Sequence, residues 1–138
     1  MAREATVQTQ LRVRIGNINY VSNPSNFQAT VTGINGPCPG AFAATLEGTD
    51  VNFSELTQPG LGIIKNIDST NFVTVGIWDG VDFFPLMELL PGEFFPIRFS
   101  RYLTQEFMTG TGTTGGGNTV RIKADTAPAK VVVEAFEA

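Results

Sequence analysis

The segment Asp82-Phe-Phe-Pro-Leu-Met-Glu-Leu-Leu-Pro-Gly-Glu-Phe-Phe-Pro-Ile-Arg-Phe99 decides the fold class. It contains two short runs rich in phenylalanine and leucine, separated by Pro91-Gly92, a pair that suits a type II turn. Short apolar runs bounded by turn residues are typical of β-strands, whereas helices need longer uninterrupted windows. We therefore predict two strands, residues 83–90 and 94–99, joined as a hairpin.

Similar short segments recur along the whole chain. In residues 7–15 the apolar side chains share one face of a strand, while the glutamines and arginines share the other. Further strands are predicted at residues 27–32, 41–46, 51–56, 61–65, 72–78, 119–123 and 129–136, many of them paired as hairpins, including 61–65 with 72–78. Glycine, proline, asparagine and threonine interrupt every window that could show a helical period. About ten short strands and no substantial helix predict an all-β antiparallel β-sandwich, of which a jelly roll is one form.

The length of 138 residues fits a single domain, residues 1–138. We expect residues 1–6 to form a flexible N-terminal arm and the Gly/Thr-rich residues 109–117 to form a flexible loop. The first ten residues lack the apolar core of a signal peptide, and no run of 18 apolar residues occurs. These features predict a protein that is made in the cytoplasm, is not secreted and does not enter a membrane.

The composition excludes several kinds of chemistry. The chain has no histidine and a single cysteine, Cys38, so it lacks the residues for a Ser-His-Asp triad, a Cys-His pair or a His-ligated zinc site. Its net charge of −4 and nine scattered cations argue against nucleic acid as a partner. Cys38 has no cation near it in sequence and is predicted to be unreactive. We expect no enzymatic activity, no cofactor and no metal.

Three weaker candidate sites each have a simpler explanation. The oxygen-bearing residues 66–71 resemble part of a calcium loop, but the same residues make Asx-turns, which we favour. A glycosidase would need two carboxylates facing each other across a cleft. The candidates, which are more simply exposed turn residues, are Asp79, Asp82, Glu88 and Glu93. Trp78 and Tyr102 are the weak candidates for a glycan-stacking site, the alternative for Trp78 being a place in the core.

The predicted strands at 83–90 and 94–99 are apolar on both faces. By simple alternation one face of the first strand carries Phe84, Leu86 and Leu90, and the other carries Phe83, Met87 and Leu89. Either both faces are covered within the domain, or one packs on another subunit. Pro85 and Pro96 cannot donate to a β-ladder and so indicate edge strands or bulges, which favours a subunit interface. The candidate interface residues are Phe83, Met87, Leu89 and Phe94.

The balance of charged and apolar residues also favours a covered surface. Only 16% of the residues are charged, whereas 42% are hydrophobic. About a quarter of the residues of a typical soluble domain are charged. A partner that covers part of the surface would explain this balance, and an ordinary, lightly charged β-sandwich is the alternative.

The central third of the chain resembles a family of small bacteriophage and prophage proteins. The resemblance rests on a leading Pro59-Gly60, on Asn66-Ile-Asp-Ser-Thr-Asn-Phe-Val-Thr-Val-Gly76, and on Leu89-Leu-Pro-Gly-Glu93 before an apolar strand ending at Arg98. Residues 121–134 are similar to the closing strands of the same family. Altogether the resemblance covers about half of the chain.

The resemblance implies a β-sandwich component of a virion with no catalytic residues. We expect a capsid decoration or cement protein whose partners are other virion proteins, such as the major capsid protein, and further copies of itself as a homo-oligomer. Its location would be the virion, after synthesis in the host cytoplasm. The alternatives are a tail or fibre-adaptor component, and a carbohydrate-binding module for host recognition.

Overall fold

The computed structural model describes residues 3–22, 25–31, 33, 35–100 and 119–137, and these residues form twelve β-strands and no helix. The all-β prediction is confirmed. The chain divides into two compact units, Met1–Thr32 and Gly33–Ala138, which we call the N-terminal arm and the sandwich. Tyr102 and residues 109–117 lie outside the described residues.

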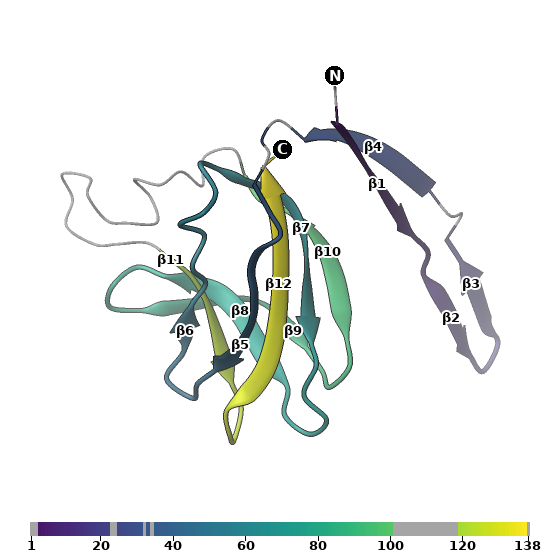
Figure 1. Cartoon of the computed structure of the whole chain (residues 1–138). Coiled ribbons are helices and arrows are strands. Elements are labelled where there is room, and N and C mark those ends of the chain that lie inside the picture. Colours follow the sequence, from purple (N-terminus) through teal and green to yellow (C-terminus); the bar gives the residue numbers. More distant parts are fainter. Residues whose placement is uncertain (1–2, 23–24, 32, 34, 101–118, 138) are drawn as a thin grey trace. The chain divides into compact units, whose positions relative to one another are not determined.

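The N-terminal arm is a two-stranded antiparallel ribbon (Figure 1). Strand β1 (Arg3–Thr9) pairs with β4 (Ser25–Val31), and β2 (Arg12–Ile15) pairs with β3 (Ile18–Val21). The strand predicted over residues 7–15 is therefore interrupted between Thr9 and Arg12. Residues 3–6, part of the predicted flexible arm, belong to β1.

The sandwich contains the remaining eight strands: β5 (Cys38–Ala44), β6 (Thr49–Asp50), β7 (Pro59–Asn66), β8 (Val73–Trp78), β9 (Phe83–Leu89), β10 (Phe94–Arg98), β11 (Thr119–Ala124) and β12 (Ala129–Glu137). They form two four-stranded sheets, ordered β10-β7-β12-β5 and β6-β11-β8-β9 (Figure 1). The pairing is nested, since the first strand pairs with the last, the second with the seventh, the third with the sixth and the fourth with the fifth. This nesting makes the sandwich a jelly roll.

The core lies between the two sheets and follows from strand alternation. In β12 every second residue, from Ala129 through Val131 and Val133 to Ala135, is buried, because these residues face the opposite sheet. The rings of Phe53 and Phe99 meet edge to face with their centroids 5.2 Å apart. Burial of a large apolar side chain contributes about 1.5–3 kcal/mol. Alternation places many such side chains on the inner faces of the sheets, and their burial is the main driving force for the fold.

Two predicted hairpins are wrong. Strands β7 and β8 lie in different sheets, and so do β9 and β10. The turn chemistry between β9 and β10 is nevertheless as predicted: Gly92 has a φ of 82°, and the Glu93 N–H donates to the Leu90 carbonyl over 3.0 Å. A turn of this type reverses the chain without specifying whether the next strand joins the same sheet, and here it crosses to the other one.

Asn66, at the end of β7, ties the two crossing connections together. Its side chain is 1% exposed and donates to the carbonyls of Asn71 and Leu89 over 2.9 and 3.0 Å. Its Oδ1 accepts from the Asp68 N–H, while its backbone bonds with Gly92 and Glu93. Five hydrogen bonds from one residue therefore hold two of the places where the chain passes between the sheets, the connections β7–β8 and β9–β10.

Replacing Asn66 with leucine should lower the free energy of unfolding by about 3 kcal/mol or more, because it leaves two carbonyls and one N–H without their partner. Urea denaturation of the purified protein measures this loss. The matched control is Asn52→Leu, which removes an exposed Asx bond to the Ser54 N–H and should cost less than about 1 kcal/mol. Equal losses in the two variants would contradict the role given to Asn66.

Candidate functional site

Strands β9 and β10 are edge strands of the two sheets, and the short connection 90–93 brings them to the same margin of the sandwich (Figure 1). This margin exposes a group of large apolar side chains, with the exposed fractions Phe84 51%, Leu86 70%, Leu90 48%, Phe94 62% and Phe95 57%. We call these five residues the β9–β10 edge. Exposed apolar residues on an edge strand are unusual in a protein that acts alone, because such edges invite pairing with another chain.

Two of these side chains belong to the inner faces of their strands. Phe84 lies opposite Ile77, and Phe95 lies opposite Ile64, both of which belong to or pack against the core. Residues directly opposite each other in a sheet share a face. Phe84 and Phe95 therefore lie on the core side of the sheets but are left half exposed, since no further strand lies beyond β9 or β10 in the described part of the chain.

The composition of the predicted interface needs correction because β9 contains a β-bulge. Val75 pairs with Met87, but the next residue, Gly76, pairs with Pro85, so Leu86 is the extra residue. The bulge reverses the alternation, and Phe83 and Met87 lie on opposite faces rather than on the same face. A β-carbon on Gly76 would lie 2.8 Å from the Phe83 ring, so the glycine makes room for this ring.

The four predicted interface residues therefore do not share one surface. Leu89 is fully buried in the core, and Met87 packs against it, so neither forms part of an outer surface. Phe83 is half-buried on the outer face of its sheet, with the Lys123 Nζ 5.4 Å from its ring centre. Phe94 is well exposed at the margin. Alternation assigned Phe84, Leu86 and Leu90 to the other face, yet these residues supply most of the exposed apolar surface.

The positions of the two prolines agree with the sequence prediction. Pro85 lies at the bulge of edge strand β9, and Pro96 lies in edge strand β10. Both positions tolerate a residue without an N–H. The prolines also reduce the number of donors that these edges can offer, which limits uncontrolled strand addition.

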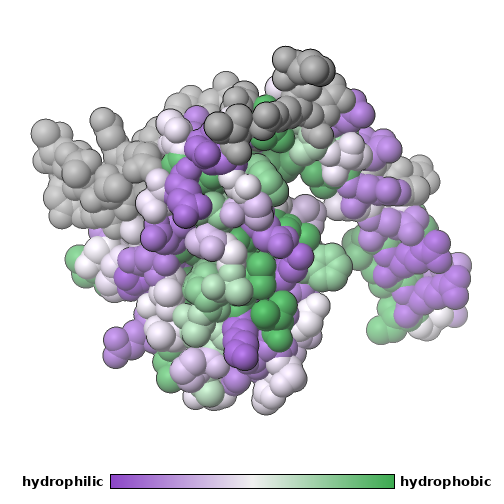
Figure 2. Space-filling model, in the orientation of Figure 1, coloured by the Kyte–Doolittle hydropathy of each residue, from purple (hydrophilic) through white to green (hydrophobic). Residues whose placement is uncertain are grey.

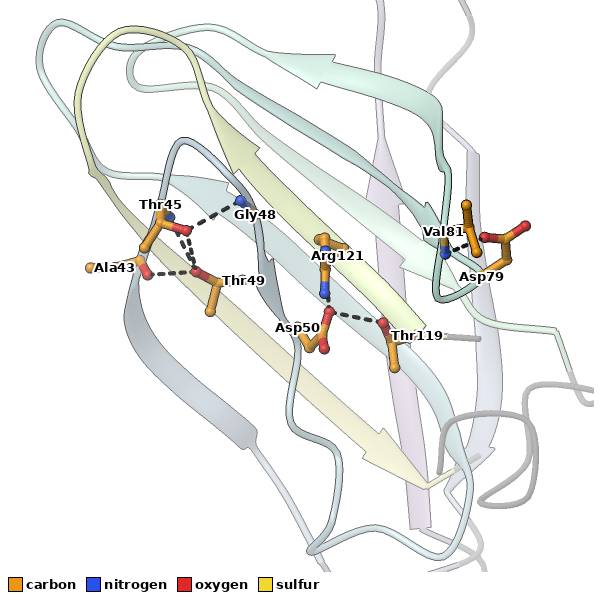
Figure 3. A network of polar contacts seen from close by, with 9 residues as sticks. All are labelled: Ala43, Thr45, Gly48, Thr49, Asp50, Asp79, Val81, Thr119 and Arg121. Atoms are coloured by element: carbon orange, nitrogen blue, oxygen red, sulfur yellow. Dashed lines mark hydrogen bonds and ion pairs between the residues drawn. The ribbon is translucent and has the colours of Figure 1, made fainter. Parts of the chain in front are cut away.

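A polar network covers the outer face of the second sheet near Trp78 (Figure 3). Asp50 Oδ1 accepts from the Thr119 hydroxyl over 2.8 Å and from Arg121 Nε over 2.7 Å. The Arg121 guanidinium lies 4.1 Å from the centre of the Trp78 ring. Arg121 therefore occupies one face of the only tryptophan, which leaves less of the ring for stacking on a sugar.

Two of the four predicted carboxylates, Asp79 and Glu93, bind backbone N–H groups of their own turns. Asp79 Oδ1 accepts from the backbone N–H groups of Val81 and Asp82, and these bonds hold the pKa of Asp79 below its ordinary value (Figure 3 shows the bond to Val81). Glu93 Oε2 accepts from the Leu90 N–H. Asp82 and Glu88 are exposed. Among the residues that the structure describes, no group of three or more acidic or cysteine side chains could hold a metal ion.

The segment 66–71 forms the Asx-turn that the sequence predicted. Asp68 Oδ1 accepts from the N–H groups of Thr70 and Asn71 over 2.9 and 2.8 Å, and these bonds lower the pKa of Asp68. Cys38 is buried, and its thiol donates to the Asn52 carbonyl over 3.4 Å. Burial raises the pKa of this thiol, which agrees with the predicted lack of reactivity.

Comparison with known proteins adds no assignment: no family model, curated protein or solved structure matches the chain. Within the described residues there is also no helix long and apolar enough to cross a membrane. Of the nine large apolar side chains that the described part of the sandwich exposes, five belong to the β9–β10 edge.

The Asp50 network predicts a defined dependence of stability on pH. Partial burial raises the pKa of Asp50, but hydrogen bonds from Arg121 and Thr119 outweigh this effect and leave it lowered. A lowered pKa stabilises the fold above the unfolded value of about 3.9, and this stabilisation disappears as the pH falls through the folded pKa. Since the side chain of Asp50 is 46% exposed, its contribution is under about 1 kcal/mol.

Asp50→Asn should therefore lower the free energy of unfolding at pH 7 and have a much smaller effect near pH 3, where the wild-type carboxylate is being protonated. Urea denaturation at the two pH values measures the difference. Asp125→Asn, at an exposed position of the β11–β12 turn, is the control and should show little change at either pH. A loss for Asp50→Asn that is the same at both pH values would show that the charge is not involved.

Proposed function

We propose that this protein is a non-enzymatic structural component of a bacteriophage particle, and more specifically a capsid decoration protein that attaches to its neighbours through the β9–β10 edge. The observation that carries the attachment role is the exposure of five large apolar residues along two adjoining edge strands. The assignment to a phage particle rests on the resemblance of the motifs between Pro59 and Arg98, and of residues 121–134, to small virion proteins.

The energetics favour burial of this edge. Moving one phenylalanine or leucine side chain fully out of water contributes about 1.5–3 kcal/mol, so a few half-exposed residues are enough to hold a specific contact. Each edge strand also presents backbone groups on the side away from its paired neighbour, and a strand of another protein can bond to such groups. A particle built of many copies multiplies each contact, so even a moderate affinity gives full occupancy.

The polar side chains support a structural rather than a chemical role. Asp68, Asp79 and Glu93 all accept backbone N–H groups of their own turns. Asp50 is engaged by Arg121 and Thr119. Acids that are used in this way stabilise the loops and edges that present the apolar surface, and they are not paired across a cleft as a hydrolase would require.

Phe94→Asp should abolish co-sedimentation of the protein with phage heads while leaving the sandwich folded. Phe94 is 62% exposed, so the substitution costs little within the monomer, whereas a buried carboxylate at an interface is strongly unfavourable. Mixing purified protein with heads that lack it, followed by sedimentation, measures the effect. Circular dichroism and a urea midpoint close to the wild-type value confirm the fold.

The matched control is Leu46→Asp, which also places a carboxylate on an exposed apolar position but lies in the β5–β6 turn, away from β9 and β10. This variant should still sediment with heads. If Phe94→Asp sediments with heads as the wild type does, the β9–β10 edge is not the attachment surface. If the wild-type protein binds isolated tails and not heads, it is not a capsid decoration protein. The proposal that it is a structural component of the phage particle would then stand.

A further inference from the structure

The N-terminal arm has one apolar face and one polar face. In β1 and β4 the register places Ala5, Val7, Phe27, Ala29 and Val31 together, whereas the opposite face carries only polar residues such as Gln8 and Gln28. In β2 and β3 one face carries the four apolar residues Val13, Ile15, Ile18 and Tyr20. In Figure 2 one side of the arm is largely hydrophilic, and hydrophobic residues emerge along its margin.

The apolar face of the arm lacks a covering layer within the arm itself. Ile15 is 68% exposed, Ile18 58% and Tyr20 53%. A ribbon of two strands has no second sheet on which to bury such a face, and an isolated hairpin is only marginally stable in water. A surface that covers Val13, Ile15, Ile18 and Tyr20 would therefore stabilise the arm as well as bind it.

The charges of the arm and of the β9–β10 edge are complementary. The arm carries three arginines and one glutamate, a net charge of +2, whereas the sandwich carries six cations and twelve carboxylates, a net charge of −6. Residues 79–98, which include β9, β10 and the turn between them, contain four carboxylates and one cation, Arg98. Arg12 and Arg14 lie in β2 on the face opposite Val13 and Ile15, so in the proposed contact they attract the edge over a distance and do not touch it. Opposite charges on two surfaces attract each other before the surfaces touch, which speeds association and favours the matching partner.

We propose that the N-terminal arm of one copy packs its apolar face on the β9–β10 edge of a second copy, so that the protein self-associates by arm exchange. This inference builds on the proposed function, since it names a partner for the same edge. Each copy offers one arm and one edge, which are different surfaces. Such a contact forms a reciprocal dimer or a ring if its rotation closes, and a filament if it does not.

Two variants of the full chain test the arrangement. Ile15→Asp alters the arm at a 68% exposed position, and Phe94→Asp alters the edge at a 62% exposed position. Sedimentation velocity should show an oligomer for the wild type and single chains for each variant, with association weakened about 30-fold or more. An equimolar mixture should form a heterodimer, because the intact arm of Phe94→Asp can bind the intact edge of Ile15→Asp.

Each other outcome overturns the proposal. A monomeric wild type at all concentrations would show that the arm does not bind a second copy. Oligomers that survive Ile15→Asp would exclude the arm as the contact. Variants that are monomeric alone and remain monomeric when mixed would exclude a contact between an intact arm and an intact edge. Association of Phe94→Asp alone would indicate contacts between two arms, and association of Ile15→Asp alone would indicate contacts between two edges.

Charge reversal provides a second test that does not depend on the apolar substitutions. The double variant Arg12→Glu/Arg14→Glu and the double variant Asp82→Lys/Glu88→Lys should each associate at least about 10-fold more weakly than the wild type, and a mixture of the two should recover affinity. The control Glu47→Lys/Asp125→Lys makes the same change in net charge away from β9 and β10 and should associate like the wild type. Equal weakening by the control, or no recovery in the mixture, would refute the charge attraction between arm and edge.

Binding to phage heads remains a separate measurement. Arm exchange fails, and the proposed function stands, if Ile15→Asp leaves the oligomer intact while Phe94→Asp still prevents sedimentation with heads. The reverse result, arm exchange without any binding to heads or tails, would retain the self-association and overturn the role in the particle.

Discussion

The crossing of the chain between the two sheets depends at two points on one buried residue, Asn66, which links the connections β7–β8 and β9–β10. A sandwich in which consecutive strands alternate between layers has no local ladder to hold its crossings in place. Asn66 supplies the missing bonds: its side chain reaches Asn71 in one connection and Leu89 before the other, and its backbone bonds with Gly92 and Glu93. Because such a buried amide is costly unless each of its bonds is made, it specifies one arrangement of the two crossings.

The hydrogen bonds of Asn66 also help to determine where the β9–β10 edge lies. By holding the 90–93 turn against the end of β7, they place β9 and β10 at one margin, each as the last strand of its sheet. The inward-facing residues Phe84 and Phe95 then reach a margin with no further strand among the described residues to cover them. The exposure of the β9–β10 edge is thus a consequence of the topology, and the bulge at Leu86 adds to it by turning one more apolar side chain outward.

Much of this fold is predictable from local pattern, and the rest depends on nonlocal information. Alternation correctly identified the strands at residues 119–123 and 129–136, and the residue types correctly gave the turns at 66–71 and Pro91–Gly92. The same turns were expected to close hairpins, because a type II turn has the same local sequence whether the chain pairs with itself or crosses to another sheet. The predicted face of Phe83 was wrong for a similar reason. One bulge in β9 inverts the alternation, and only the register of β9 with Val75 and Gly76 reveals the bulge.

The two uncovered apolar surfaces are best understood together. A sandwich of this size can bury its own core, as the fully enclosed Ile64, Val131 and Leu89 show, so the exposed residues are not the result of too little interior. The arm and the β9–β10 edge are each amphipathic, they differ in the sign of their charge, and they belong to different units of the chain. Two surfaces that differ in position and in the sign of their charge are suited to binding each other between copies. A single self-complementary patch would permit pairs at most, whereas one arm and one edge on each copy would also permit closed rings.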